Sequence, residues 1–496
     1  MNVETLGHLA PMFVLMGAAA LLLLYEVFSN QPSRSWAANF STAALVIVGW
    51  MLFGRLDAPP AELFASDDFV PIIVDAFSTT ASLVVVVGAA VACLISPAYA
   101  RNAGHDTGEY YALLLFSVVG MMVMVMAGDL ITFFLGLETM SVAVYCLTGI
   151  RTNDARSSEA ALKYFLMGAF ATGFLLFGIA FVYGATGGVT YEVMARALRA
   201  PGGIAELPIL PLGIVMVLVG FAFKVSAVPF HMWAPDVYEG APTPVTGFMA
   251  VGVKAAAFVA LLRVVMSGLP GLEDASQMVW VPFLSTLAIL TVVVGNALAL
   301  VQSSIKRMLA YSSVSHAGYA LIGVVAAAKG EPSAGTAVLY YLSGYTFMTI
   351  GAFGVLTFLE RKDGGAESER YGAFAGVGHR HPALALAMVL FMVALGGLPP
   401  TAGFFGKLYI FTAAIRAGEL GLALVGILGS VISIAYYLRV LVAFYMRDVP
   451  DPGATPSATG SPQLTVGLLV ASAGVIGLGV FPSAWIEITR AATAAL

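Results

Sequence analysis

Apolar segments of about twenty residues follow one another along the whole 496-residue chain. A helix that crosses a bilayer needs about 20 mostly apolar residues, so this pattern predicts an all-α polytopic membrane protein. The chain has room for about fourteen transmembrane helices. We expect them near 9–28, 37–55, 71–95, 110–127, 130–150, 159–184, 208–228, 245–267, 279–301, 307–328, 335–359, 382–417 (interrupted), 420–446 and 464–485.

Composition excludes several classes of protein. Hydrophobic residues make up 59% of the chain and charged residues only 10%, which is typical of membrane proteins and not of soluble domains. The net charge of −5 is small for this length and indicates no nucleic-acid partner. The sequence contains neither a GxGxxG fingerprint after a strand nor a Walker loop, so we expect no recognisable dinucleotide or ATP site.

The two cysteines, Cys93 and Cys146, lie in separate apolar segments. An iron–sulfur cluster usually needs more thiolates than this pair supplies, and a disulfide needs two cysteines in close approach. We therefore expect both cysteines to be buried structural residues, and no cofactor or metal on this chain. The energy source for any transport must come from other chains.

The loops predict an orientation, because cytoplasmic loops are enriched in Lys and Arg. Alternate loops hold eleven such residues on one side against six on the other, so the first side is expected in the cytoplasm and both termini outside. The first set is Arg34, Arg101, Arg151, Arg156, Lys306, Arg307, Arg361, Lys362, Arg370, Arg380 and Arg447, and the second is Arg55, Arg196, Arg199, Lys329, Arg416 and Arg490.

Five ionisable residues lie inside the apolar segments: Glu138, Lys163, Lys224, Lys254 and Lys407. A charge at mid-membrane depth costs about 2.5–3.5 kcal/mol even on lenient scales, so it persists where it faces a partner or water. Charges of both signs within one helical bundle indicate a proton or ion pathway. Each also has a structural alternative. Glu138 could be held by a neighbouring Ser or Thr, and the shallower Lys163 could extend its ammonium to the interface.

Three further residues complete the candidates. His316 is the one histidine expected inside a helix, where it either relays protons between Lys254 and Lys407 or satisfies a buried polar contact. Arg263 and Arg439 lie near helix ends, and we expect both to anchor at the membrane interface.

Two parts of the chain resemble each other. Residues 161–168 match 337–344, and the segment after each carries a lysine with a proline interruption, Lys224 with Pro229 and Lys407 with Pro399-Pro400. Proline lacks an amide hydrogen and crowds the carbonyl four residues back, so the seventh helix is expected to open directly after Lys224. If the units are helices 4–8 and 9–13, the odd number of spans forces opposite orientations, as in the inverted repeats of secondary transporters.

The repeat predicts a division of the chain. We expect an N-terminal three-helix segment at 1–109, a first five-helix repeat at 110–268, a second at 279–447, and a C-terminal helix at 464–496.

Residues 223–245, FKVSAVPFHMWAPDVYEGAPTPV, resemble the seventh-helix signature of the antiporter-like subunits of bacterial NADH:quinone oxidoreductase, respiratory complex I. The segment 396–407, GGLPPTAGFFGK, is similar to the twelfth helix of that family. Within the family, the lysine at position 407 favours the N type of subunit over the M type.

This resemblance implies roles and partners. Glu138 and Lys224 would form the input pair, Lys254 the central carrier and Lys407 the exit-side group, with Lys163 modulating the pair. NADH, FMN, iron–sulfur clusters and quinone would belong to other subunits of the complex, and subunits M and K would be neighbours. The chain would lie in the bacterial cytoplasmic (inner) membrane.

Two other functions remain open at this point. A subunit of a multi-chain cation/proton antiporter would share the architecture but would be driven by an ion gradient. A structural membrane-arm subunit would not pump at all, and its lysines would serve assembly.

Overall fold

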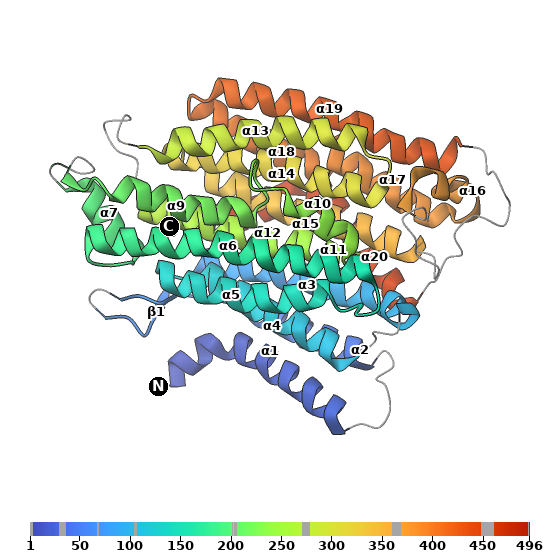
Figure 1. The fold of residues 1–496 in the computed structure, drawn as a ribbon, viewed down its shortest axis with the longest axis horizontal. Coiled ribbons are helices and arrows are strands. Elements are labelled where there is room, and N and C mark those ends of the chain that lie inside the picture. Colours follow the sequence, from blue (N-terminus) through green and yellow to red (C-terminus); the bar gives the residue numbers. More distant parts are fainter. Residues whose placement is uncertain are drawn as a thin grey trace.

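The computed structural model describes residues 3–28, 36–66, 69–103, 107–200, 202, 206–269, 278–359, 369–447, 461–494 and 496. These residues form a bundle whose long helices run roughly along one common direction, with α1 at one edge, α19 at the opposite edge, and α12, α14 and α15 between them (Figure 1). The chain is therefore an all-α membrane bundle, as the apolar segments predict. Four of the cations that predict the orientation have side chains outside the described residues: Arg34, Arg101, Arg361 and Lys362.

Within the described residues, 12 helices are long and apolar enough to cross a membrane. Eleven of them are single α-helices: α1 (Val3–Phe28), α2 (Trp36–Phe53), α3 (Ala76–Ala103), α4 (Gly108–Met126), α5 (Leu130–Thr148), α6 (Ala155–Thr186), α13 (Trp280–Val301), α14 (Ile305–Ala328), α15 (Ala334–Leu359), α19 (Leu420–Tyr445) and α20 (Pro462–Val480). The twelfth combines α11 (Thr243–Phe248), η1 (Met249–Val253), α12 (Lys254–Arg263) and η2 (Val264–Gly268).

The other two of the fourteen predicted spans are the ones in which proline interrupts the helix. In the first, α9 (Leu210–Lys224) ends at Lys224 and α10 (Trp233–Gly240) follows after an irregular stretch, which confirms the predicted opening after Lys224. In the second, α17 (Pro382–Gly396) and α18 (Ala402–Arg416) are separated by residues 397–401, which include Pro399-Pro400. Each half is too short to count as a span by itself, so the prediction of about fourteen spans includes both broken helices.

Polar side chains cap the first turns of several helices. Asp129 caps α5, Asp154 caps α6, Ser304 caps α14 and Ser461 caps α20, each accepting a hydrogen bond from a backbone N–H of the first turn. Such caps satisfy amide groups that have no partner within the helix. Gly187, with φ of 78°, ends α6 in the left-handed conformation that glycine adopts without a steric penalty.

Short elements lie at the two ends of the bundle. One end carries α7 (Tyr191–Arg199) and the antiparallel pair β1 (Ala61–Leu63) and β2 (Ile72–Val74), and both chain termini lie there as well (Figure 1). The opposite end carries η5 (Tyr371–Phe374) and α16 (Val377–Arg380). The last span bends at Phe481 and continues as α21 (Pro482–Thr493).

The two predicted repeats pack in the same order. In the first, α4 packs on α5, and α6 packs on both halves of the broken helix, α9 and α10. In the second, α13 packs on α14, and α15 packs on both α17 and α18. The boundaries predicted for the repeats stay a prediction, but these pairings are the ones that two copies of one five-helix unit would make.

Each repeat begins with two helices that approach closely at glycine residues. Gly120 of α4 faces Gly136 of α5, whereas Gly295 of α13 faces Ser315 of α14, and Gly318 of α14 faces Val292 of α13. A methyl group added at Gly120 would lie 2.4 Å from the amide nitrogen of Met140. Small residues of this kind let two helix backbones approach closely in a membrane.

We expect Gly120→Ala to destabilise the protein, because the obstructing atoms belong to the backbone and cannot rotate away. Forced overpacking of this kind costs about 1–3 kcal/mol, so the midpoint of thermal unfolding of the solubilised protein should fall. Gly173→Ala on α6 is the matched control, since nothing lies within 4 Å of its added methyl group and the midpoint should hold or rise slightly. Equal midpoints for both variants would contradict the close crossing.

The cysteine prediction is half right. Cys93 is buried, but Cys146 is exposed on α5. The apolar segment around Cys146 faces both the bundle and its surroundings, and apolar composition alone does not tell these two faces apart.

Candidate functional site

Lys224 is the last residue of α9 and is 2% exposed. Its Nζ donates a hydrogen bond to Ser141 Oγ at 2.7 Å and lies 3.5 Å from the hydroxyl of Tyr145, both on α5. The ammonium also lies 5.5 Å from the centroid of the Tyr145 ring and 5.8 Å from that of Tyr164, within the range of cation–π attraction. The lysine is thus held by neutral oxygens and aromatic rings.

Glu138 does not contact Lys224. It is partly exposed on α5 and accepts a hydrogen bond from Thr172 Oγ1 of α6 at 3.0 Å, while Lys224 forms no ion pair within 4.0 Å among the described residues. Ser141, one turn further along α5, receives the lysine instead. Glu138 and Lys224 are therefore not in direct contact in this structure, and the structural alternative for Glu138, a Thr partner, is present. Their role as an input pair stays a prediction.

Lys254 lies where the π-helical turn η1 meets α12, and it is 2% exposed. Its Nζ donates to the backbone oxygen of Ser313 at 2.8 Å and to the Ser313 hydroxyl at 2.5 Å, both on α14. The hydroxyl of Tyr345 on α15 donates to the same Ser313 oxygen at 3.0 Å. Single π-helical turns inside α-helices occur frequently at functional sites.

His316 lies one turn beyond Ser313 on α14 and is 2% exposed. Its Nδ1 shares a hydrogen bond with the Tyr341 hydroxyl at 2.6 Å, and its Nε2 shares one with the Tyr437 hydroxyl at 2.9 Å. Tyr437 also shares a hydrogen bond of 2.5 Å with Ser312. Both ring nitrogens are occupied, so the site fits a relay as well as the structural alternative of a satisfied buried histidine.

Lys407 lies in α18, is 4% exposed, and reaches back across the break. Its Nζ donates to the backbone oxygens of Leu395 at 2.9 Å and Gly396 at 3.2 Å, and to Ser430 Oγ on α19 at 2.9 Å. The first two are carbonyls at the end of α17, which need a donor because the helix stops there. The ammonium also lies 4.9 Å from the centroid of the Tyr319 ring.

The buried lysines are connected through α14 and a set of aromatic rings. Lys254 and Lys407 lie on either side of α14, which contributes Ser313, His316 and Tyr319 to the interval between them. Between Lys224 and Lys254 the rings of Tyr164, Trp233 and Tyr238 follow one another, with centroids 4.4 Å and 6.0 Å apart. Tyr238 in turn lies beneath Lys254, whose ammonium is 5.9 Å from the ring centroid.

Sequence reasoning missed these aromatic residues. Trp233 and Tyr238 are visible in the segment after Pro229, but their position between two lysines depends on the way α10 folds back. The seryl and tyrosyl partners of the lysines come from α5, α14, α15 and α19, and no local spacing relates those helices to one another.

Lys163 differs from the other lysines, because its side chain is 42% exposed and carries carboxylate partners. Its Nζ lies 2.6 Å from Glu159 one turn earlier and 3.1 Å from Asp236 of α10. Asp236 also binds Arg307 of α14 at 2.9 Å. Lys163 is thus tied to the segment that follows the break beyond Lys224.

A larger charged cluster surrounds this contact, at the end of the bundle opposite the termini. Arg307 also binds Glu239 at 2.6 Å, and Glu239 lies 3.4 Å from Arg156. Carboxylates at positions 236 and 239 share one face of α10, and this spacing is the signal from which the cluster could have been found.

The prediction for Arg263 is wrong. The residue is 2% exposed and buried within the bundle, where its guanidinium makes two hydrogen bonds to Asp75, of 2.9 Å and 2.8 Å. Arg439 is partly exposed and donates to the backbone oxygens of Leu300 and Gln302 at the end of α13. It therefore binds carbonyl groups at a helix end, which position in the sequence alone did not reveal.

The described residues contain no group of three or more His, Cys, Asp or Glu side chains arranged to hold a metal ion. The candidate site consists of lysines, hydroxyl groups, one histidine and aromatic rings. Groups of these kinds can bind, hold and pass protons.

A family model described as "NADH:quinone oxidoreductase/Mrp antiporter, TM" matches residues 127–433. This range is more than half of the chain and contains Glu138, Lys163, Lys224, Lys254, His316 and Lys407, although Tyr437 lies just beyond it. The chain belongs to this family. The resemblance of 223–245 and 396–407 to its antiporter-like subunits is confirmed.

Curated relatives within the NADH:quinone oxidoreductase/Mrp antiporter family extend over nearly the whole chain. One, named NADH-quinone oxidoreductase subunit N 1, comes from Sorangium cellulosum and is 45% identical, with 96% of each chain covered. Another, named NADH-quinone oxidoreductase subunit N, comes from Myxococcus xanthus and is 42% identical, covering 97% of this chain and 96% of the relative.

Solved structures agree with the family. A chain of respiratory complex I from Thermus thermophilus with bound aureothin is 34% identical with a TM-score of 0.78, covering 96% of this chain and 98% of that one. A chain of the Mrp complex from Dietzia sp. has a TM-score of 0.84 but only 21% identity, covering 100% of this chain and 98% of that one. The second likeness concerns the fold alone.

Proposed function

We propose that the chain is the proton-translocating subunit N of the membrane arm of a bacterial NADH:quinone oxidoreductase. The observation that carries this proposal is the chemistry around Lys224, Lys254 and Lys407. Each ammonium is buried, and each is held by hydroxyl or carbonyl oxygens, with no carboxylate within 4.0 Å among the described residues. A carboxylate partner would favour the charged form, whereas neutral partners allow a lysine to release its proton without leaving an unpaired anion.

The arrangement supports an order of transfer. Lys224 takes the input position with Glu138 acting across Ser141, Lys254 is the central carrier, and Lys407 is the exit-side group. His316, hydrogen-bonded on both nitrogens, links the surroundings of Lys254 to those of Lys407.

Lys163 acts on this series through α10. Its ion pair with Asp236 joins α6 to the segment beyond the break, so a shift of that segment moves charge relative to Lys224.

The driving reaction belongs to partner chains in this proposal. NADH, FMN, iron–sulfur clusters and quinone are held by other subunits, and subunits M and K are the expected neighbours. The names of the curated relatives support the assignment to such a complex. Translocase activity is thus a property of the assembly, and this chain supplies a proton path.

The proposed location is the bacterial inner membrane, with both termini on the periplasmic side. Two features support this orientation. The termini lie at one end of the bundle (Figure 1), and Arg156 and Arg307, two cations of the predicted cytoplasmic set, lie in the first turns of α6 and α14, where they join one charged cluster.

The test is NADH-driven proton uptake by inside-out membrane vesicles that carry Lys224→Ala, with assembly checked by the size of the solubilised complex. We expect proton uptake and NADH:quinone turnover to fall together, by about tenfold or more, while the complex keeps its size. Uptake and turnover at wild-type levels would contradict the proposal. Proton exchange driven by a sodium gradient in place of NADH would favour the cation/proton antiporter. Wild-type proton uptake after Lys→Met substitution at each of Lys224, Lys254 and Lys407 would favour a structural subunit.

A further inference from the structure

We propose that a groove at the end of the bundle that carries the termini binds one anionic phospholipid. The groove lies between α15, α18 and α21 and has a volume of about 750 Å³. Its lining combines two arginines and several hydroxyl groups with apolar side chains. The proposal is independent of proton transfer, because none of the lysines of the candidate site lines this groove.

Two arginines supply the charge. Arg416 lies in the last turn of α18 and Arg490 in the last turn of α21, and both line the groove. Neither forms an ion pair within 4.0 Å in the part of the chain that the structure describes. The Arg guanidinium is well suited to a phosphate, because its fork of N–H groups matches two phosphate oxygens.

Two nearby carboxylates are engaged elsewhere. Glu419 pairs with Lys329 at 2.9 Å, and Glu331 accepts a hydrogen bond from the Ser333 hydroxyl at 2.6 Å. A third, Glu487, lies one turn before Arg490 on α21 but forms no ion pair with it within 4.0 Å among the described residues. An external anion can therefore bind both guanidinium groups without displacing an ion pair.

The rest of the groove fits acyl chains. Met266, Leu408 and Ile486 line it, and the hydroxyls of Thr336 and Thr493 bind each other at 2.8 Å. A groove with a cationic edge at a helix end and an apolar wall deeper in the membrane matches a phospholipid, whose phosphate lies at the boundary and whose chains extend inward.

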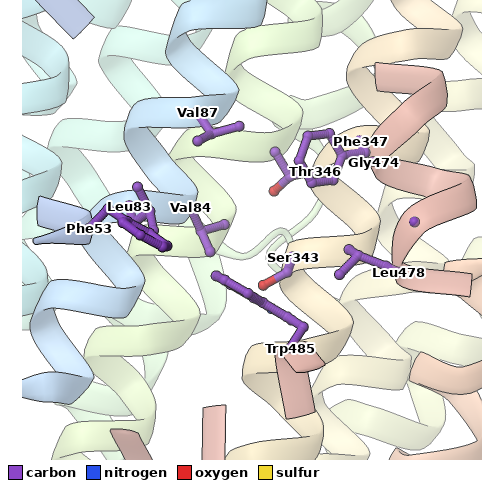
Figure 2. A pocket seen from close by; sticks show the side chains of 11 residues that line it. Phe53, Leu83, Val84, Val87, Ser343, Thr346, Phe347, Gly474, Leu478 and Trp485 are labelled. Atoms are coloured by element: carbon purple, nitrogen blue, oxygen red, sulfur yellow. The ribbon is translucent and has the colours of Figure 1, made fainter. Parts of the chain in front are cut away.

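Two other grooves lack this chemistry. One of about 430 Å³ lies between α3, α15 and α20, where Val84, Phe347 and Trp485 face the space (Figure 2). Another of about 610 Å³ lies between α17 and α20. Neither is lined by an Arg or Lys, so neither selects an anionic lipid over a neutral one.

The experiment uses the whole complex, solubilised in mild detergent, with and without Arg416→Gln and Arg490→Gln together. Co-purifying phospholipids are extracted and counted by mass spectrometry, and rebinding is measured with phosphatidylglycerol and with phosphatidylcholine in mixed micelles. We expect the double variant to lose one anionic phospholipid per complex and to rebind phosphatidylglycerol roughly 30-fold more weakly, as two juxtamembrane cations would imply. Binding of phosphatidylcholine should not change.

Two further variants sharpen the test. Ile486→Trp fills the apolar wall but keeps both arginines, and it should lose the same lipid. If Ile486→Trp keeps the lipid and inorganic phosphate alone displaces it, the arginines bind a free anion and the proposal is overturned. Arg196→Gln with Arg199→Gln on α7 removes two cations from the same end and should retain the lipid. Unchanged lipid content in the Arg416/Arg490 variant would overturn the proposal. If the Arg416/Arg490 variant kept its lipid but lost a neighbouring subunit, the proposal would also be overturned, because the two arginines would then bind a partner chain.

Discussion

Lys254→Met is expected to reduce NADH-driven proton uptake by about tenfold or more while the complex still assembles. Methionine approximates the length of the lysine side chain without its ammonium, so packing against α14 is largely kept. What is lost is the proton-binding group that lies between Lys224 and Lys407 and donates to Ser313 at 2.8 Å and 2.5 Å. No other buried lysine in the described residues contacts α14 through Ser313. The measurement is the initial rate of proton uptake in inside-out vesicles, with assembly checked by the size of the complex.

Lys329→Met is the matched control for this prediction, because Lys329 has no part in the proposed path. Its side chain is 30% exposed and pairs with Glu419 at 2.9 Å, a contact that contributes about 0–1 kcal/mol to stability, so assembly and the rate of proton uptake should stay close to wild type. Equal losses of uptake in the two variants would contradict the buried path.

Asp75→Asn is expected to cost about 3–5 kcal/mol of stability, the largest effect on folding that we predict. Asp75 and Arg263 are 5% and 2% exposed, and they form a bidentate pair that joins the start of α3 to the end of α12. Removing one charge leaves the other buried and unpaired. Asparagine can still accept the hydrogen bond from the Ser78 amide, so the substitution removes the charge but keeps the helix cap. The readout is the thermal unfolding midpoint of the solubilised complex together with its yield.

The control replaces the pair as a whole. Asp75→Leu combined with Arg263→Met leaves no unpaired charge, and replacing a buried ion pair by apolar groups is often close to neutral, so most of the stability should return. The loss of the cap at Ser78 would leave a deficit of about 1 kcal/mol. A double variant as unstable as Asp75→Asn would show that the carboxylate matters for another reason.

Much of the fold follows from local sequence. Spans of about 20 apolar residues define the helices because the bilayer fixes their length. Pro229 and Pro399-Pro400 mark the two breaks because proline removes a backbone donor. The candidate lysines also follow from sequence, since a charge inside an apolar segment needs a specific environment.

The contacts of these residues could not be predicted, because they depend on tertiary packing. Arg263 lies near a helix end, and only the fold brings it to Asp75, which is 188 positions away in sequence. The same reason explains why Ser141 holds Lys224 where Glu138 was expected. The π-helical turn before Lys254 has no recognised sequence signal, as its hydrogen bonds shift by one residue within an otherwise ordinary apolar segment.

The most direct test of the account is the number of protons moved per NADH oxidised by the purified complex in sealed liposomes, compared between wild type and a Lys224→Met, Lys254→Met double variant. The account predicts that the double variant, correctly assembled, moves fewer protons and oxidises NADH more slowly, because the path through this chain is interrupted and coupling restrains the redox reaction. A double variant with the wild-type proton number and the wild-type rate would contradict the claim that protons pass through these buried lysines.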